Sequence, residues 1–266
     1  MGELWRYRPW LTVFDVPSKG LRTRVRGVKA RRTHHLLSLL ELMFFFIAEF
    51  NDSVLDIREQ YPLLPQSDTL EIAKQLGIKH PVDPITKYPI VLTTDFLLTV
   101  RHGATDQLQA WSVKYLRDLA KPRTLEKEEV QRRRWHQQGI SWRLFTERDI
   151  TPTQARNIRF LFPFRKPRSL RGIPHPLIRH LCDYLDDHIT DGSVLADVCS
   201  TYEERYSVSR GTALMVSRYL LANKHWPLNL SHVISPLHPL VFRSTSPQIS
   251  QKVAHAASQE CLTRLA

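Results

Sequence analysis

Cysteine is scarce in this sequence, with three residues (Cys182, Cys199 and Cys261) in a chain of 266. Their odd number and wide spacing indicate neither a disulfide framework nor a zinc site. We therefore expect reduced, buried cysteines in a protein of the cytoplasm.

Long hydrophobic runs are also missing. The most apolar segment, residues 36–50, is shorter than the roughly 20 residues that a membrane-spanning helix needs, and Glu41 and Glu49 interrupt it. Residues 1–10 lack the apolar core of a signal peptide. We expect no association with a membrane and a buried helix in the apolar segment.

Acidic residues are the minority among the charges: the chain has 26 of them against 38 lysines and arginines, a formal net charge of +12. Residues 19–32 carry seven basic side chains and no acid, and residues 162–174 carry four and no acid. Such concentrated positive charge suits a polyanion such as the DNA backbone, and a solvated basic surface is the alternative. The candidate DNA contacts are Lys19, Arg22, Arg24, Arg26, Lys29, Arg31, Arg32, Arg165, Lys166 and Arg168.

Three of these arginines occupy alternate positions. Arg22, Arg24 and Arg26 are separated by Thr23 and Val25, a pattern typical of a strand with one basic face. Arginines at this spacing suit contacts with successive phosphates. An edge strand whose charges prevent aggregation is the alternative interpretation.

The order of the expected elements indicates an α/β fold. A helix is predicted over about 33–50, and the remaining patterns predict strands at 53–63, 90–100, 108–115 and 140–145 and helices at 69–75, 124–138 and 152–160. Because helices and strands interleave, we predict one α/β domain with a mixed sheet flanked by helices.

The composition changes after residue 161, where a basic, proline-rich segment follows. Beyond it, three helical patterns and a short apolar strand predict a small, mostly helical, winged-helix-like domain. Such a domain either reads DNA or docks on a protein, and its mixed charges favour a protein partner. The predicted domains are a basic arm (1–33), the α/β domain (34–161), a linker (162–176), the helical domain (177–243) and a polar tail (244–266).

Three charged residues lie within or at the end of apolar segments: Glu41, Asp95 and Lys114. Isolated charges in such segments are costly unless they are compensated, so three of them predict one shared site. Two carboxylates and a lysine suit metal-assisted attack of water on a phosphodiester. Mg²⁺ prefers oxygen ligands and keeps several waters, so the candidate ligands are Glu41, Asp95, the Ser112 hydroxyl and the Val113 carbonyl.

Several unusual strings occur in a fixed order along the first part of the chain. They are WLTV at 10–13, VPS at 16–18, HHLLS at 34–38, LEL at 40–42, VLDIREQYPL at 54–63, GIKHP at 77–81, TDFL at 94–97 and TLEK at 124–127. In these strings the sequence resembles the TnsA family, the endonuclease subunit of heteromeric cut-and-paste transposases, from about residue 10 to residue 160.

The resemblance implies a restriction-endonuclease-like fold and cutting of the 5′ strand at each transposon end with Mg²⁺, or Mn²⁺ as a substitute. It implies two protein partners: a DDE-type transposase subunit (TnsB-like), and an AAA+ ATPase regulator (TnsC-like) that contacts the C-terminal domain. The expected location is the bacterial cytoplasm, at the nucleoid during transposition. By position, Glu41 and Asp95 match the catalytic acids of the family, and Lys114 matches its catalytic lysine.

Two positions depart from the family pattern. Ser112 stands where related nucleases have an acid or a glutamine, so a direct metal contact by its side chain is in question. Gln131 stands where a relative has a glutamate, so any auxiliary carboxylate is lost or is supplied by Glu128 or Glu129.

Two other functions remain open at this point. One is a catalytically silent adaptor that keeps the nuclease fold, binds DNA and recruits partners. The other is a transcriptional regulator built on the helical domain. The combination of Glu41, Asp95 and Lys114 favours the nuclease, because neither alternative has a use for it.

Overall fold

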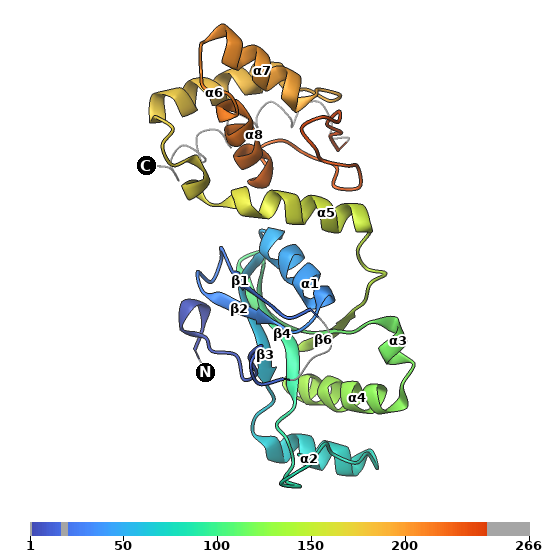
Figure 1. Ribbon diagram of the computed structural model, residues 1–266. Helices are drawn as coiled ribbons and strands as arrows, with labels where there is room; N and C mark the ends of the chain where they lie inside the picture. The colour runs from blue at the N-terminus through green and yellow to red at the C-terminus, as the bar shows by residue number, and fades with distance from the viewer. Residues whose placement is uncertain (1, 17–20, 244–266) are drawn as a thin grey trace. The chain divides into compact units, whose positions relative to one another are not determined.

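The computed structural model describes residues 2–16 and 21–243. It divides the chain into two compact units, Met1–Ile150 and Thr151–Ala266, which Figure 1 shows in blue to green and in yellow to orange.

The first unit is built on a four-stranded mixed sheet with the order β3-β4-β5-β6. β3, β4 and β5 are antiparallel neighbours, and β6 is parallel to β5. The strands are β3 (Val54–Pro62), β4 (Thr93–His102), β5 (Thr105–Val113) and β6 (Ser141–Phe145). This confirms the predicted mixed sheet.

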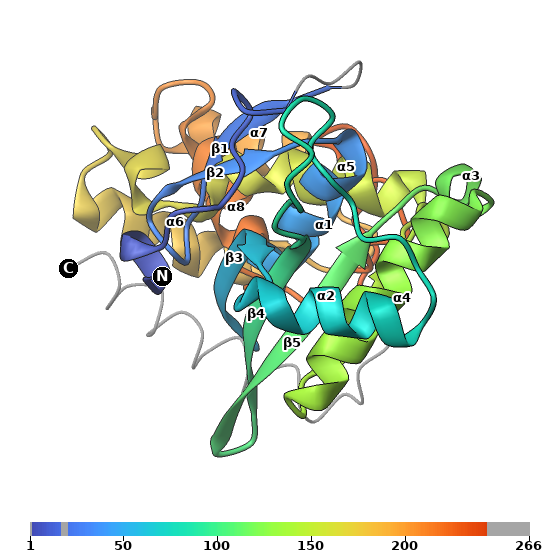
Figure 2. The ribbon, with the colours of Figure 1, turned by 90° about the horizontal axis from the view of Figure 1, so that it is seen from below.

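Helices cover both faces of this sheet (Figure 1). The helices of the unit are η1 (Leu4–Arg6), α1 (Leu39–Phe50), α2 (Gln66–Gln75), α3 (Leu116–Leu119) and α4 (Pro122–Gln137). On one face the Phe44 ring of α1 lies 4.8 Å from Phe96 and 5.2 Å from Trp111. On the other face α2 and α4, side by side in Figure 2, pack in one apolar cluster with Leu97 and Ala110. The alternation of side chains along β4 and β5 therefore separates the two cores.

The helix predicted over 33–50 is wrong in its first turns. Residues Thr33–Leu36 form strand β2, which pairs with β1 (Thr23–Arg26) in a separate antiparallel sheet. Ser38 then caps α1, since its hydroxyl accepts a hydrogen bond from the Glu41 amide at 3.1 Å. The pattern did not reveal this boundary, because the apolar run at 36–50 begins inside β2 and continues through α1.

The second unit is mostly helical. It contains α5 (Pro152–Leu161), η2 (Phe162–Arg165), η3 (Pro167–Leu170), α6 (His175–His188), α7 (Leu195–Arg205) and α8 (Thr212–Ala222). Helix α8 is central, because α5, α6, α7, η2 and η3 all pack against it. Strand pairing in the described residues from 177 to 243 is limited to the isolated bridges Val194↔Pro239 and Leu228↔Phe242.

The division between the units lies at Ile150/Thr151, before the proline-rich segment in which a linker is expected. Thr151 begins α5 with a capping box to Gln154, and Asn157 of α5 hydrogen-bonds the carbonyls of Leu230 and His232. The expected linker, residues 162–176, instead forms η2, η3 and the first residues of α6. These contacts join α5 and the following turns to the helical unit.

Cys182 and Cys199 are buried, as expected, and Cys261 lies outside the described residues. Among the described residues, no helix combines the length and the apolar character needed to cross a membrane.

Candidate active site

The candidate site lies at one end of the mixed sheet. Phe96 pairs with Trp111, so Asp95, near the start of β4, lies beside Ser112, near the end of β5. Lys114 follows β5 directly, and Glu41 comes from the first turn of α1. Antiparallel pairing brings the start of β4 to the end of β5, which is why residues distant in sequence meet here.

Asp95 is 9% exposed and is held by three donors. Its Oδ2 atom accepts hydrogen bonds from the Lys114 ammonium at 2.5 Å, the Val113 amide at 2.7 Å and the Ser112 hydroxyl at 3.2 Å. In the described part of the chain Oδ1 accepts no hydrogen bond, so the protein fixes one oxygen and leaves the other for a ligand.

Glu41 is 6% exposed and is fixed at the N-terminus of α1. Its Oε2 atom accepts a hydrogen bond from the Leu37 amide at 2.9 Å and lies 3.5 Å from the Gln60 amide nitrogen. Burial and the neighbouring Asp95 raise the pKa of Glu41 to about 7, against the lowering effect of Leu37 and Lys114. Two close carboxylates resist simultaneous ionisation, so Glu41 and Asp95 form a site that a cation would stabilise.

Lys114 supplies positive charge to this group of acids. Burial by itself would lower its pKa, but Asp95, Glu128 and Glu41 outweigh burial and raise it. Its ammonium lies 2.5 Å from Asp95 and 3.6 Å from Glu128. The three predicted catalytic side chains therefore interact in one site, together with Ser112 and Val113.

The sequence left open whether Glu128 or Glu129 of α4 supplies an auxiliary carboxylate, and the structure places Glu128 beside the site. It is 5% exposed, and its carboxylate accepts a hydrogen bond from Gln131 at 3.4 Å. Burial raises the pKa of Glu128 above its usual range. The neighbouring Asp95 adds to this effect, and Lys114 and Ser112 only partly oppose it. Glu129 instead pairs with Arg132 and Arg133 on the exposed side of α4. Helical spacing could have distinguished Glu128 from Glu129 in the sequence. Glu128 is three residues before Gln131 and so lies on the same face of the helix, whereas Glu129 lies on another face.

The predicted DNA contacts fall into different environments. Lys19 lies outside the described residues. Arg22, Arg24, Arg26 and Arg31 are exposed on or beside the β1–β2 hairpin. Arg22 donates to the carbonyls of Val13 and Val16, and the Arg24 guanidinium lies 5.5 Å from the Phe14 ring. The hairpin therefore presents basic side chains to solvent.

The prediction that Arg32 contacts DNA is wrong, because Arg32 is 8% exposed and lies in the core. It donates to both oxygens of Glu59, at 2.5 and 2.7 Å, and to the Ile57 carbonyl at 2.9 Å. Glu59 also lies 2.8 Å from the His34 ring. This network ties the β1–β2 hairpin to β3, so Arg32 stabilises the fold.

The remaining basic candidates are less exposed than their charge predicts. Lys29 is half-buried and donates to the Val54 carbonyl at 2.5 Å. In the second unit Arg165 and Lys166 are half-buried and Arg168 is exposed. A basic run in sequence therefore divides between structural and surface positions.

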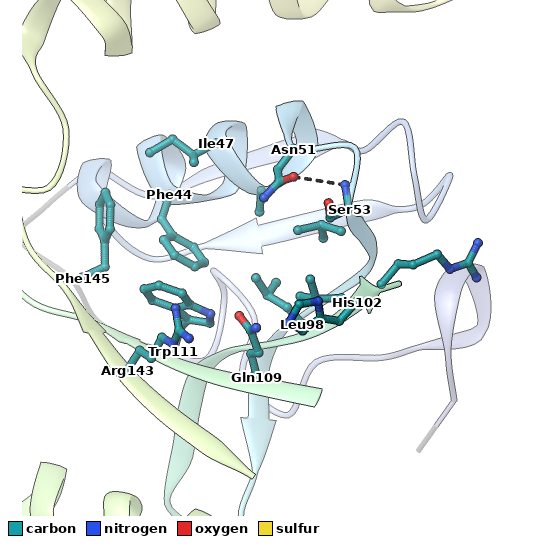
Figure 3. Close-up of a pocket in the computed structure, with 14 residues that line it drawn as sticks. Phe44, Ile47, Asn51, Ser53, Leu98, His102, Gln109, Trp111, Arg143 and Phe145 are labelled. Atoms are coloured by element: carbon teal, nitrogen blue, oxygen red, sulfur yellow. Dashed lines mark hydrogen bonds between the residues drawn. The ribbon is translucent and has the colours of Figure 1, made fainter. Parts of the chain in front are cut away.

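A cavity of about 440 Å³ lies elsewhere in the first unit, between the C-terminal half of α1 and the sheet (Figure 3). Trp111, Arg143 and Phe145 line its side nearest β6, and His102 lies at the other side. None of Glu41, Asp95, Lys114 and Glu128 lines it. The cavity is therefore separate from the candidate site.

The donors in the candidate site fit a hard divalent cation. Mg²⁺ binds carboxylate and carbonyl oxygens, and Glu41 and Asp95 place two carboxylates within electrostatic reach of each other. A bound cation could be coordinated by Oδ1 of Asp95, which accepts no hydrogen bond from the described residues. It would also relieve the repulsion from Asp95 that helps to raise the pKa of Glu41. The described residues contain no group of three or more His, Cys, Asp and Glu side chains arranged as a metal site by themselves. Substrate and water oxygens would complete the coordination.

Comparison with known proteins shows which family this chain resembles. The family described as "TnsA-like endonuclease N terminal" matches residues 51–147, and "TnsA endonuclease C terminal" matches residues 149–230. The boundary between the matches lies beside the division of the two units at Ile150. The transposon Tn7 transposition protein TnsA of Escherichia coli is 41% identical over 227 residues, which are 84% of this chain and 80% of that protein.

The mixed α/β fold and these similarities define an endonuclease of Tn7-type transposition. The chain belongs to the TnsA endonuclease family. This confirms the resemblance inferred from the sequence strings. Asp95, Ser112, Lys114 and Glu128 lie inside the N-terminal match, and Glu41 lies before it.

Proposed function

We propose that this chain is a Mg²⁺-dependent DNA endonuclease that cuts the 5′ strands at transposon ends within a heteromeric transposase. The observation that carries the proposal is the convergence of Glu41, Asp95 and Lys114 from α1, β4 and the end of β5. An adaptor without catalysis has no use for two buried carboxylates whose negative charges repel each other.

The roles of the residues follow from their contacts. Glu41 and Asp95 would hold the cation, with the Val113 carbonyl and the Ser112 hydroxyl as further candidate ligands. When bound, Mg²⁺ neutralises charge on the attacked phosphate and makes water a better nucleophile. Lys114, a compact cation with three N–H donors, would hold the scissile phosphate or the attacking water. Oδ2 of Asp95, which accepts the Lys114 hydrogen bond, keeps that amine in place.

DNA would be held by the exposed arginines of the β1–β2 hairpin. Arg22, Arg24 and Arg26 are candidates for phosphate contacts, together with Arg31 and, in the second unit, Arg168. Phosphate contacts position a duplex without reading its sequence. This division of labour suits a nuclease whose site of cutting is chosen by partner proteins.

The second unit would bind a protein. In a helix-turn-helix the second helix must enter the DNA groove, and α8, which follows α7, is instead packed on several sides. We therefore assign to this unit the contact with an AAA+ ATPase regulator (TnsC-like). The DDE-type transposase (TnsB-like) would cut the 3′ strand, and the complex would act on nucleoid DNA in the bacterial cytoplasm.

Removal of divalent cations is expected to abolish cutting. The full chain, combined with its transposase and regulator on a duplex carrying a transposon end, should nick the labelled 5′ strand with Mg²⁺ and not with EDTA. Added Mg²⁺ or Mn²⁺ should restore the product on a denaturing gel, because the two carboxylates need a cation to face a phosphate. Nicking that persists in EDTA would contradict the proposed chemistry.

Affinity for Mg²⁺ is expected to rise with pH between 6 and 8. Because the pKa of Glu41 is raised to about 7, a proton must leave Glu41 before it binds a cation. Below pH 7 the affinity should fall by up to about tenfold per pH unit. Isothermal titration calorimetry of the full chain with Mg²⁺ at pH 6, 7 and 8 measures this.

The matched control is Glu41→Gln, which cannot titrate. Its weaker Mg²⁺ binding should show little dependence on pH in this range. Equal affinity of the unmodified chain at pH 6 and pH 8 would remove Glu41 from the set of cation ligands.

A further inference from the structure

We infer that Glu128 is a positioning residue of the nuclease site, which holds the Lys114 ammonium jointly with Asp95. This inference rests on the proposed endonuclease function and adds a group to it. The first observation is location: Glu128 is 5% exposed, on a helix whose other glutamates Glu126 and Glu129 pair with arginines near the solvent. Burying a carboxylate is costly, so its partners inside the protein define what it does.

Those partners are residues of the candidate site. The Glu128 Oε1 atom lies 3.6 Å from the Lys114 nitrogen. The Lys114 ammonium also donates to Asp95. Glu128 and Asp95 therefore lie on the same ammonium, Asp95 in a hydrogen bond and Glu128 in a longer ion pair.

A chain of hydrogen bonds fixes α4 against the strand that carries Asp95. The Trp135 indole donates to the Thr94 hydroxyl at 2.7 Å, and this hydroxyl donates to Gln131 at 3.0 Å. Gln131 in turn donates to Glu128 at 3.4 Å. Because Thr94 precedes Asp95, the position of Glu128 is set relative to Asp95 by packing and hydrogen bonds within the fold.

This arrangement explains how a short side chain at position 112 is accommodated. Lysine is a flexible four-carbon chain that ends in a point charge, and one carboxylate alone leaves its ammonium free to swing. Asp95 accepts a hydrogen bond from the ammonium, and the Glu128 carboxylate 3.6 Å away adds a second negative charge that restricts where the ammonium lies. Serine at 112 is small enough to leave room for Glu128 beside Lys114.

The test compares Glu128→Gln with Glu129→Gln, which makes the same change of charge at the next residue on the exposed side of α4. In the full complex with Mg²⁺, Glu128→Gln should slow single-turnover nicking of the 5′ strand about tenfold or more. DNA binding and the melting temperature should change little. Glu129→Gln should cut at the unmodified rate.

A second measurement reports on Lys114 without catalysis. The full chain is treated with an acetylating reagent, and the modification of the Lys114 peptide is followed by mass spectrometry. Loss of a carboxylate 3.6 Å from the amine should make Lys114 react severalfold faster in Glu128→Gln, because fewer acids hold its proton. Glu129→Gln should leave the rate unchanged.

The outcomes separate the alternatives. Unchanged nicking by Glu128→Gln overturns the inference, and slower nicking with unchanged Lys114 reactivity shows that Glu128 acts other than through Lys114. If the unmodified complex itself fails to cut, the proposed function fails and this role fails with it. Glu128→Asp keeps the charge but shortens its reach, and should give both changes to a smaller extent if Glu128→Gln does not fold.

Discussion

Asp95→Asn is expected to cut the 5′ strand roughly 100- to 1,000-fold more slowly than the unmodified chain, the cost typical of losing a group that stabilises the transition state. Asparagine has the same shape and can still accept the Val113 hydrogen bond. It lacks the charge that pairs with Lys114 on Oδ2 and that would bind the proposed cation on Oδ1. The measurement is single-turnover nicking in the full complex with saturating Mg²⁺.

Asp106→Asn provides the matched control. Asp106 lies in β5, at the far end from Asp95, and pairs with exposed Arg101. It should cut normally, and both variants should keep the circular dichroism spectrum of the unmodified chain. If Asp95→Asn cuts within threefold of the unmodified chain, the assigned site is wrong and the adaptor interpretation gains support.

Arg32→Ala is expected to destabilise the first unit by about 3–5 kcal/mol, the usual cost of leaving a buried charge without its partner. Glu59 is fully buried and would keep only the His34 ring and backbone contacts. In a unit of this size the loss corresponds to a fall of about 10 °C in melting temperature. Thermal unfolding at pH 7 measures it, and Arg101→Ala, which breaks an exposed ion pair, should change little.

The same pair gives a pH dependence whose sign is fixed. Burial alone would raise the pKa of Glu59, but hydrogen bonds from Arg32 and His34 overcome it and lower the pKa to about 2. A lowered carboxyl pKa stabilises the fold above the ordinary value of about 4.3, and this stability is lost as the pH falls toward 2. The difference in melting temperature between the unmodified chain and Arg32→Ala should therefore narrow from pH 5 to pH 2. A constant difference would contradict the role of the ion pair.

The sequence predicted well those features that depend on local pattern. Alternation and turn residues predicted strands β3 to β6 and their interleaved helices to within a few residues, because period and chain reversal are local properties. Charges placed among apolar residues predicted that Glu41, Asp95 and Lys114 share a site, since burial makes unpaired charges costly. Composition alone did not separate β2 from α1, because Leu36 of β2 belongs to the same apolar run as α1.

By itself, then, the sequence determined the mixed α/β class, the family and the three charged residues that meet at the end of the sheet. Only the tertiary structure decided which neighbours complete that group. Arg32, one of several basic residues that the sequence does not distinguish, is buried against Glu59. Glu128 lies beside Lys114, whereas Glu129 pairs with Arg133. The physical reason is the same in each case: burial and pairing depend on how one element packs on another, and adjacent residues on a helix or strand face different surroundings.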